Sequence, residues 1–535
     1  MKRTGNEELQ RIYPACRSVL GSHTWKRIIN ACTDDLDPGK FSDILSYYLN
    51  DPGVLGFIPE LARLEWALFW LKNSNIRLPA EVGAWVTNPT LQVLRLSWKN
   101  LLFLLSPEKE GKKEEPVLEE EIVLLWIDPK SMTPRTGIAS NEDLLALKIV
   151  VEGIDPDDAA REGNLTVGAV YNLLFRAGKK GILRPPKSLI RRDPETFPKG
   201  SDIDEQFFSS PVFTLQWHIT QVCDLRCKHC YDRSDISPLG LDQAMGILDD
   251  MRSFCRSRNV SGHISFTGGN PLLYPNFIEL YRAASERGFS LAVLGNPAPR
   301  REIEEIMEVE KPGFFQVSLE GLPEHNDFIR GEGHFRKVMD FLTVLKELGI
   351  CSMVMLTLTR DNMDQVLPLA EVLRVKADVF TFNRLSLVGE GANLAPSEKG
   401  RYADFLDAYM KAAEQNPIMG LKDNLINILL RRKGSKPFGG CAGYGCGAAF
   451  NFMTVLPDGE AHACRKFPSP LGNVLGEGIA GVYESERAEQ YRAGCRACAS
   501  CRIRPVCGGC LAVTHSFGLN VFEERDPYCF IDTAY

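Results

Sequence analysis

The sequence of 535 residues contains no apolar run of about 20 residues, the length that a membrane-spanning helix needs. It also has no excess of positive charge, because 62 Lys and Arg stand against 69 Asp and Glu, and the net charge of −7 disfavours a duplex-binding protein. The segment Met1–Cys16 lacks the apolar core and the small-residue cleavage site of a signal peptide. We therefore expect a globular cytoplasmic protein with neither a membrane nor a nucleic acid as its partner.

Cysteine, in contrast, is plentiful, with 16 copies. In a reducing compartment so many thiols are not expected to form disulfides. A free cysteine packs as a small hydrophobe, and four that stand among apolar or helical neighbours are interpreted as core or surface residues: Cys16, Cys32, Cys255 and Cys351. The other twelve form two groups, a triplet at 223–230 and nine cysteines between Cys441 and Cys529.

The first part of the chain changes from helical to strand-like patterns. Residues 7–73 carry apolar positions at helical spacing. Residues 91–106 and 119–129 are predicted as strands, and the charged run Pro107–Glu121 between them as a solvated loop. Three helices are then predicted, at 141–153 with Asn141 as the N-cap, at 155–164, and at 166–183 opening at Thr166. Strands followed by three helices are a winged-helix pattern, and the tract Pro185–Pro198 is expected to be a linker.

From about Pro211 strands and helices alternate. The strands are predicted at 212–220, 263–269, 290–296, 313–321, 351–359 and 378–388, and helical patterns at 241–258, 276–288, 301–310 and 335–349 lie between them. This alternation predicts an α/β fold with a parallel sheet, and six strands favour a partial (β/α)6 TIM-type barrel. The chemistry of such a barrel is expected at the C-terminal ends of its strands.

The triplet lies directly after the first of these strands, in HITQVCDLRCKHCYDR at 218–233. A [4Fe–4S] cluster normally has four thiolate ligands, and a structural zinc site also has four. Three thiols leave one coordination position available, as catalysis requires. His229 is a poor fourth ligand because it would be held in a very tight loop. We expect the open position to receive a substrate or a cofactor.

The spacing of Cys223, Cys227 and Cys230 after the first strand resembles that of the radical S-adenosylmethionine (SAM) superfamily. The resemblance implies that these three catalytic thiolates bind a [4Fe–4S] cluster, that SAM chelates the fourth iron, and that SAM cleavage yields a 5′-deoxyadenosyl radical. His229 stands where the family commonly has an aromatic residue, whose backbone faces the adenine.

Further positions carry the same resemblance, and each keeps a plainer alternative. In SFTGGNP, Gly268 and Gly269 would let the backbone approach the SAM amino group, with Asn270 where Glu is common; an ordinary strand-end turn is the alternative. Asn296 lies in a comparable third-strand turn. Ser318 in QVSLEG is a candidate for the carboxylate or ribose of SAM, or a buried strand-end serine. Arg330 would face the substrate or SAM, or form a loop salt bridge.

The nine C-terminal cysteines have spacings that alone would also suit zinc ribbons. Beside a radical SAM core they resemble a SPASM domain, which implies two auxiliary [4Fe–4S] clusters. Carried over by position, the first would use Cys441, Cys446, Cys464 and Cys510, and the second Cys498, Cys501, Cys507 and Cys529. Cys495 would be a spectator. If Cys441 is not a ligand, the first cluster would be open to substrate.

Residues 90–185 resemble the RiPP recognition element, a PqqD-like winged-helix domain that binds a leader peptide as an added edge strand. Winged helices also bind DNA, but the acidic character of this region disfavours it. The expected organisation is a helical region at 1–85, the recognition domain at 86–185, a linker at 186–210, the radical SAM core at 211–395, a helical bridge at 396–440 and the SPASM domain at 441–535.

Together these resemblances imply an enzyme that modifies a ribosomally synthesised precursor peptide. The expected product is an oxidative crosslink or ring, such as a thioether or a thio(seleno)oxazole, and the expected electron donor is of flavodoxin or ferredoxin type. Two alternatives remain, an anaerobic sulfatase-maturing or other protein-modifying SPASM enzyme, and a non-enzymatic zinc- or cluster-bearing scaffold. Sulfatase activators have an Asp after the cysteine that matches Cys464, and here that residue is Arg465, which argues against the sulfatase reading.

Overall fold

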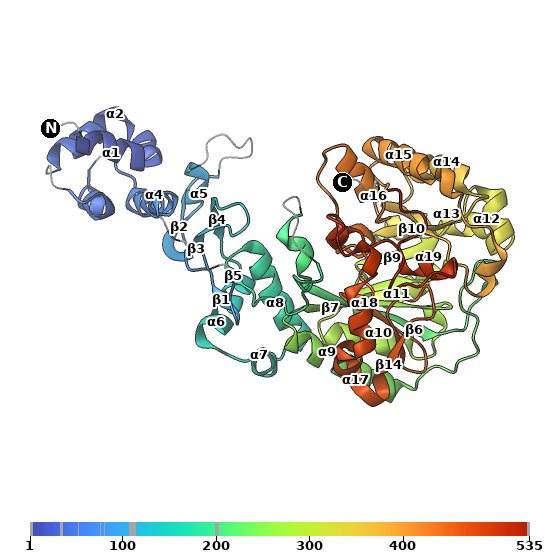
Figure 1. Ribbon diagram of the computed structural model, residues 1–535. Helices are drawn as coiled ribbons and strands as arrows, with labels where there is room; N and C mark the ends of the chain where they lie inside the picture. Colours follow the sequence, from blue (N-terminus) through green and yellow to red (C-terminus); the bar gives the residue numbers. More distant parts are fainter. Residues whose placement is uncertain are drawn as a thin grey trace. The chain divides into compact units, whose positions relative to one another are not determined.

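The computed structural model describes residues 4–32, 36–51, 53–74, 76, 78–79, 81–105, 114–197 and 203–531. The chain divides into two units, Met1–Lys187 and Ser188–Tyr535 (Figure 1). Within the described residues, no helix combines the length and the apolar character that crossing a membrane requires.

The first unit opens with helices, as the spacing predicts. They are α1 (Thr4–Ile12), α2 (Pro14–Ala31), α3 (Phe41–Tyr47) and α4 (Ile58–Asn73), with the 3-10 turn η1 (Pro38–Lys40). Glu65 on α4 is buried and accepts hydrogen bonds from the N–H groups of Ala15 (2.6 Å) and Cys16 (3.0 Å). These N–H groups belong to the first turn of α2, which has no intrahelical partner for them, so Glu65 joins the two helices.

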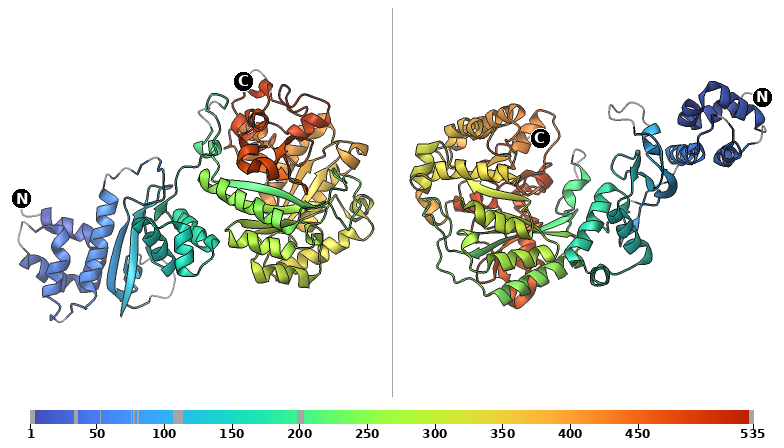
Figure 2. Two further views of the ribbon diagram at one scale, coloured as in Figure 1. Left: turned by 90° about the horizontal axis from the view of Figure 1, so that it is seen from below. Right: turned by 180° about the vertical axis from the view of Figure 1, so that it is seen from behind.

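A three-stranded antiparallel sheet follows, in the order β2 (Gln92–Lys99), β3 (Val117–Ile127), β4 (Pro134–Ile138). From Val123 to Ile127, strand β3 is buried on both faces. Val123, Leu125 and Ile127 pack with α1–α4, whereas Leu124 and Trp126 pack with the helices that follow. Figure 2 shows the sheet between these two groups of helices. Alternate side chains of a strand point to opposite faces, so one strand serves two cores.

Those helices are α6 (Asn141–Glu152), α7 (Pro156–Gly163) and α8 (Val167–Lys180), and the short strands β1 (Val86–Thr87) and β5 (Leu183–Arg184) pair beside them. Thr166 caps α8 as predicted. The predicted Asn141 cap is wrong. Ser140 is the N-cap instead, because its hydroxyl accepts the Asp143 N–H while the Asp143 carboxylate accepts the Ser140 N–H, forming a capping box.

One strand prediction and one loop prediction in this unit need correction, whereas the strand predicted at 119–129 corresponds to β3. The predicted strand at 91–106 ends at Lys99, because Asn100 adopts a left-handed conformation (φ 69°) and the short helix α5 (Leu101–Leu104) follows. Of the predicted loop Pro107–Glu121, residues 107–113 lie outside the described residues. Its last part, 117–121, belongs to β3, which is longer than its apolar half suggests.

The second unit contains all six predicted strands as parallel neighbours. They are β6 (Val212–Thr220), β7 (Ser261–Gly268), β8 (Ser290–Leu294), β9 (Phe314–Ser318), β10 (Ser352–Leu358) and β11 (Val379–Arg384). The helices between them are α9 (Leu241–Ser257), α10 (Phe277–Glu286), α11 (Arg300–Val309), α12 (Pro323–Arg330), α13 (His334–Glu347) and α14 (Val366–Leu373). The helical patterns did not predict α12 or α14, which are only eight residues long each.

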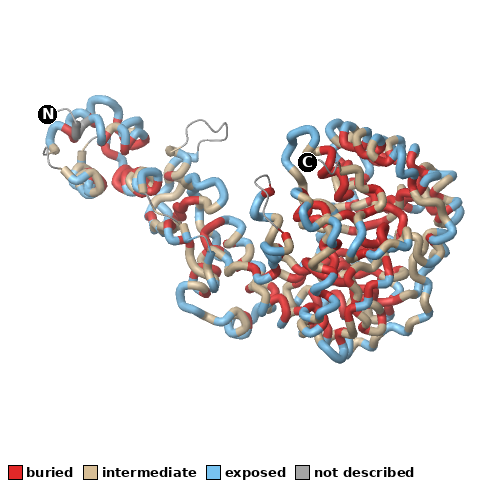
Figure 3. The backbone as a smooth tube through the Cα atoms, viewed as in Figure 1, coloured by how far each residue is buried: buried red, intermediate tan, exposed pale blue. Residues whose placement is uncertain are grey.

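The same sheet continues into the cysteine-rich region. Strand β12 (Phe452–Val455) pairs in parallel with β6, and β13 (Glu460–His462) and β14 (Pro470–Asn473) extend the sheet antiparallel. The remaining helices are α15 (Lys399–Gln415), α16 (Ile426–Arg432), α17 (Val474–Glu484), α18 (Glu486–Ala493) and α19 (Leu511–Ser516). One hydrophobic core spans these elements and the six parallel strands, seen as the dense buried interior of this unit in Figure 3.

The start of the second unit lies in the tract predicted to be a linker. Arg192 is buried and donates hydrogen bonds to the carbonyls of Tyr444 (2.8 Å) and Cys446 (2.7 Å), with its guanidinium over the ring of Phe450. Burial lowers the pKa of Arg192 to about 10. This part of the tract is therefore packed against the cysteine-rich region of the second unit.

Candidate active site

The triplet lies at the C-terminal ends of the parallel strands. Cys223, Cys227 and Cys230 follow β6 and line a cavity of about 630 Å³. Of the residues predicted to contact the cofactor, six line the same cavity: His229, Gly268, Gly269, Asn296, Ser318 and Arg330. Asn270 does not line it. Strand order thus gathers segments that are about 100 residues apart in sequence, as the strand-end rule for such folds leads one to expect.

The two glycines are required by a close backbone approach. A Cβ on Gly268 would lie 2.1 Å from the Thr220 carbonyl oxygen, and one on Gly269 would lie 2.3 Å from that of Val222. The Gly269 N–H donates to the Thr220 carbonyl at 2.8 Å, and the Asn270 N–H donates to the Val222 carbonyl at the same distance. The glycines therefore lock the end of β7 against the segment that leads into Cys223.

Asn270 and Asn296 act on the loop of the first cysteine. Both side-chain amides donate to Asp224 Oδ1, at 3.0 Å and 2.6 Å, and that of Asn296 also lies 3.5 Å from the Cys223 sulfur. Asp224 was not singled out from the sequence, because an acidic residue inside a cysteine loop has no distinguishing pattern. The two amides fix the position of Cys223 through its neighbour.

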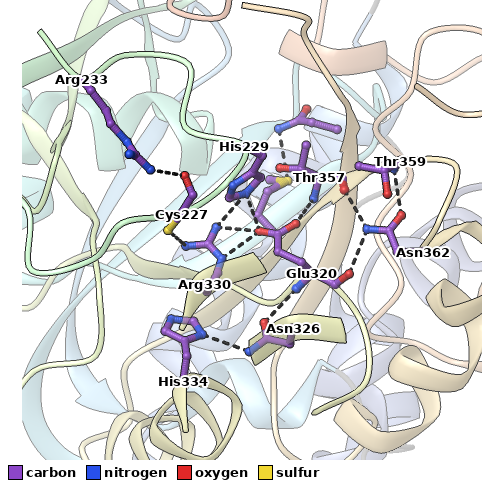
Figure 4. Close-up of polar contacts among 12 residues, drawn as sticks. Cys227, His229, Arg233, Glu320, Asn326, Arg330, His334, Thr357, Thr359 and Asn362 are labelled. Atoms are coloured by element: carbon purple, nitrogen blue, oxygen red, sulfur yellow. Dashed lines mark hydrogen bonds and ion pairs between the residues drawn. The ribbon is translucent and has the colours of Figure 1, made fainter. Parts of the chain in front are cut away.

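A buried ion cluster holds the other side of the loop (Figure 4). Glu320, which follows β9, has a side chain only 1% exposed. Its Oε1 accepts from the Arg330 guanidinium (2.6 Å) and lies 2.9 Å from His229 Nε2, and its Oε2 accepts the Thr357 N–H (2.7 Å). Arg330 also lies 3.7 Å from the Cys227 sulfur. The sequence predicted either that Arg330 faces the substrate or SAM or that it forms a salt bridge. The salt bridge to Glu320 is present, and Arg330 also lines the cavity.

Glu320 is the residue that sequence reasoning missed, although a signal was present. It occupies the acidic position of QVSLEG, where the family frequently has Asp, but only Ser318 was considered there. Burial alone would raise the pKa of Glu320, but the charges of His229 and Arg330 and the hydrogen bonds from His229 and Thr357 outweigh it and hold that pKa well below its usual range.

Replacing Glu320 with Gln is expected to lower the free energy of unfolding by about 3–5 kcal/mol, because Arg330 would stay buried without its carboxylate. Since the pKa of Glu320 is lowered, its contribution is fully present above the usual pKa of a glutamate and is lost only as the pH falls through the lowered value. The full decrease in the free energy of unfolding should therefore be seen at neutral pH. Calorimetric unfolding of the cluster-loaded enzyme checks it, with exposed Glu324→Gln as the control. Equal unfolding temperatures for both variants would contradict it.

The C-terminal cysteines gather around two further cavities. Cys441, Cys446, Cys464 and Cys510 line one of about 50 Å³, the first auxiliary cavity. Cys498, Cys501, Cys507 and Cys529 line one of about 20 Å³, the second auxiliary cavity. Cys495 lines neither. These are the two groups of four that the position-by-position comparison gives.

The donor sets fit iron–sulfur clusters. Among the residues that the structure describes, no three Cys, His, Asp or Glu side chains converge closely enough to hold a single metal ion. A cluster places each thiolate on a different iron, so its ligands surround a volume rather than a point. Burial raises the pKa of Cys446 to about 12 and of Cys464 to about 11, so as metal ligands these thiols would need the positive charge of the metal to become thiolates.

One buried ion network touches all three cavities. Arg384, at the end of β11, lines the main and the first auxiliary cavity. Its guanidinium donates to both oxygens of Asp526 (2.9 and 2.7 Å) and to Asp423 (2.8 Å). Asp526 lines the second auxiliary cavity and accepts the N–H of Cys510 at 2.9 Å. The network therefore fixes the walls of the three cavities relative to one another.

Comparison with known proteins gives the class. Residues 217–373 match the radical SAM superfamily, and residues 446–510 match the iron–sulfur cluster-binding domain SPASM. The protein is an enzyme, with a radical SAM domain followed by a SPASM domain.

Individual relatives share less than 30% of their aligned residues with this chain. The chain is 28% identical over 357 residues to the mycofactocin maturase MftC of Mycolicibacterium smegmatis, covering 61% of this chain and 84% of that protein. It is 26% identical over 367 residues to Fe-coproporphyrin III synthase of Methanosarcina barkeri, covering 61% and 90%. The crystal structure of SuiB of Streptococcus suis bound to S-adenosylmethionine has the same fold, with a TM-score of 0.50, 15% identity and coverage of 77% of this chain and 96% of SuiB.

Proposed function

We propose that this enzyme modifies a ribosomally synthesised precursor peptide by radical chemistry, with an oxidative crosslink or ring as the product. The observation that carries the proposal is the coexistence of the three-cysteine cavity with two four-cysteine cavities in one unit. A [4Fe–4S] cluster with bound SAM supplies, on reduction, a 5′-deoxyadenosyl radical that abstracts hydrogen. A flavodoxin or ferredoxin is the proposed electron donor.

The residues of this chain divide the work. Cys223, Cys227 and Cys230 hold the SAM-binding cluster, with Asn296 and the Glu320–Arg330 pair fixing the loop that carries them. The six parallel strands are proposed to form a partial barrel whose strand ends would surround SAM, with Gly268, Gly269, Ser318 and His229 assigned to its binding. Asn270 does not line the cavity and is assigned to holding Asp224 instead. The two groups of four cysteines hold two auxiliary clusters, which gives three clusters in all.

The first unit is proposed to recognise the substrate. Its sheet and three helices at 86–185 are the secondary-structure elements expected of a PqqD-like winged-helix domain. In such a domain a leader peptide adds a strand to a sheet edge through main-chain hydrogen bonds. Two relatives support a peptide substrate: MftC is named a maturase, and SuiB has been crystallised bound to precursor peptide SuiA. The likeness to the SuiB fold covers 77% of this chain, which is more residues than the second unit contains, so it extends into the first unit.

Two other substrates compete with this proposal. A sulfatase is disfavoured because Arg465 stands in place of the expected Asp after Cys464. The relative named Fe-coproporphyrin III synthase suggests a tetrapyrrole, and its match covers 61% of this chain, as does the match to MftC. A tetrapyrrole substrate would leave the first unit without its proposed role. The boundary of the first unit offers a direct test.

Deleting residues 1–187 is expected to preserve SAM cleavage in the presence of a strong reductant, because all three cavities lie in the second unit. Modification of a leader-bearing precursor encoded beside the gene should be lost, as measured by mass spectrometry after anaerobic incubation. The full-length enzyme with a precursor lacking its leader is the matched control and should fail in the same way. Unchanged turnover by the truncated enzyme would show that the first unit has another role.

A further inference from the structure

A small side cavity of about 160 Å³ opens beside the main cavity and shares Asn383, Arg465 and Lys466 with it. Its remaining lining is formed by residues from strands β6 and β12, from the segment between α15 and α16, and from the cysteine-rich loops: Thr214, Gln216, Lys422, Cys441, Ala442, Asn451, Phe452 and Cys464. The volume is larger than a single water molecule needs. Segments from four parts of the second unit therefore build a pocket next to the reaction site.

This side cavity is lined by three cations and no acidic residue. Lys422, Arg465 and Lys466 line it, and the lining contains no Asp or Glu. The Lys422 side chain is half-buried, as are Arg465 and Lys466, and burial lowers the pKa of Lys422. Cations brought together where water is partly excluded repel one another, and the arrangement costs free energy unless an anion is present.

No protein carboxylate supplies that anion. Within the part of the chain that the structure describes, none of the three forms an ion pair with an acidic side chain. Arg465 donates a hydrogen bond to the Thr267 hydroxyl at 3.4 Å. Asp423, which directly follows Lys422 in the sequence, is already paired with Arg384. The positive charge of this pocket is therefore left for something else to balance.

Cys441 and Cys464 also line the side cavity, so the first auxiliary cluster that they would hold offsets part of its positive charge. Lys422 and Lys466 line the first auxiliary cavity as well as the side cavity, so the negative charge of a four-thiolate cluster would offset them. Arg465 does not line the first auxiliary cavity. It lines the side cavity and the main cavity, where the substrate must come.

We propose that the side cavity binds a carboxylate of the substrate, with Arg465 as the residue that determines this specificity. If the proposed peptide function is correct, the segment that enters the active site carries an acidic side chain or a free C-terminal carboxylate close to the residue that reacts. Charge-assisted hydrogen bonds from a guanidinium to a carboxylate are among the stronger ones in proteins, and they orient as well as bind.

The test is equilibrium dialysis of the anaerobic, cluster-loaded full-length enzyme, with saturating SAM and no reductant, against three tritiated tripeptides. The probes are N-acetyl-Gly-Glu-Gly-amide, with an acidic side chain, N-acetyl-Gly-Gln-Gly with a free C-terminus, and the neutral N-acetyl-Gly-Gln-Gly-amide. One acidic probe should bind at one site per chain at least about tenfold more tightly than the neutral probe, since one hydrogen bond to a charged group is worth that factor. The acidic probe that binds identifies the source of the carboxylate.

Variants locate the site. Arg465→Met should reduce binding of the acidic probe to that of the neutral one, and Lys422→Met should weaken it. Exposed Arg336→Met and Lys376→Met serve as controls and should bind normally. Iron content and the visible absorption spectrum confirm intact clusters in each variant. Equal binding of all three probes, or an Arg465→Met variant that still prefers an acid, overturns the proposal. Because dialysis uses no leader, this outcome is separate from the result of deleting residues 1–187.

Discussion

Changing Cys223, Cys227 and Cys230 together to alanine is expected to abolish the reductive cleavage of SAM and to lower the iron content by about four atoms per chain. All three thiols line the main cavity, and the polar contacts of Asn296 and Arg330 are directed at the sulfurs of Cys223 and Cys227. The enzyme with intact cysteines should hold about twelve irons after anaerobic reconstitution, on the assignment of three clusters.

The measurements are iron analysis and chromatography of 5′-deoxyadenosine formed with dithionite. Cys351→Ala is the matched control, because this half-buried cysteine lies just before β10 and lines none of the described cavities. It should retain full iron and full cleavage. Persistent 5′-deoxyadenosine formation in the triple variant would refute the assignment of the radical-generating site.

Losing Cys501 is expected to stop product formation while 5′-deoxyadenosine still forms. A substrate radical must lose an electron if the product is oxidised relative to the peptide. The proposed electron acceptors are the iron–sulfur clusters that the two groups of four cysteines would hold. Cys501 lines the second auxiliary cavity and not the main one. Losing Cys464 should disable the first auxiliary cluster with the same separation of the two activities.

Cys495→Ser is the matched control for Cys501→Ala. Cys495 lies close to Cys498 but lines neither auxiliary cavity, so its loss should leave eight ligands and full product. The alternative is that the clusters only hold the fold together, since metal binding can be folding energy. Deuterium transfer from labelled peptide into 5′-deoxyadenosine, with circular dichroism as the folding check, separates the two. A folded Cys501→Ala enzyme that lacks this cluster yet yields full product would reject the acceptor role.

Much of the fold follows from local pattern. The six parallel strands and the helices of 7–73 were predicted because their apolar spacing is regular over several turns or a whole strand. The errors occur where a local feature competes. Asn100 ends β2 through its left-handed conformation, and charged residues occupy the first half of β3. Ser140 is the N-cap of α6 because it forms a capping box with Asp143. Eight-residue helices such as α12 carry too few periodic positions to be recognised.

The amino-acid sequence by itself predicted the chemistry of the site, because the spacing of three cysteines after a strand and of eight more near the C-terminus resembles that of two cluster-binding domains, and the family models match the same two regions. Tertiary structure alone decided what surrounds them. The pairing of β12 with β6 places the cysteine-rich region against the parallel sheet, and only that contact brings Arg465 from one segment and Lys422 from another into the same side cavity. Charge complementarity acts over a few ångströms in space, whereas spacing along the chain records only neighbours in sequence, so the cationic pocket and the buried Glu320–Arg330 pair emerge only when the chain is folded.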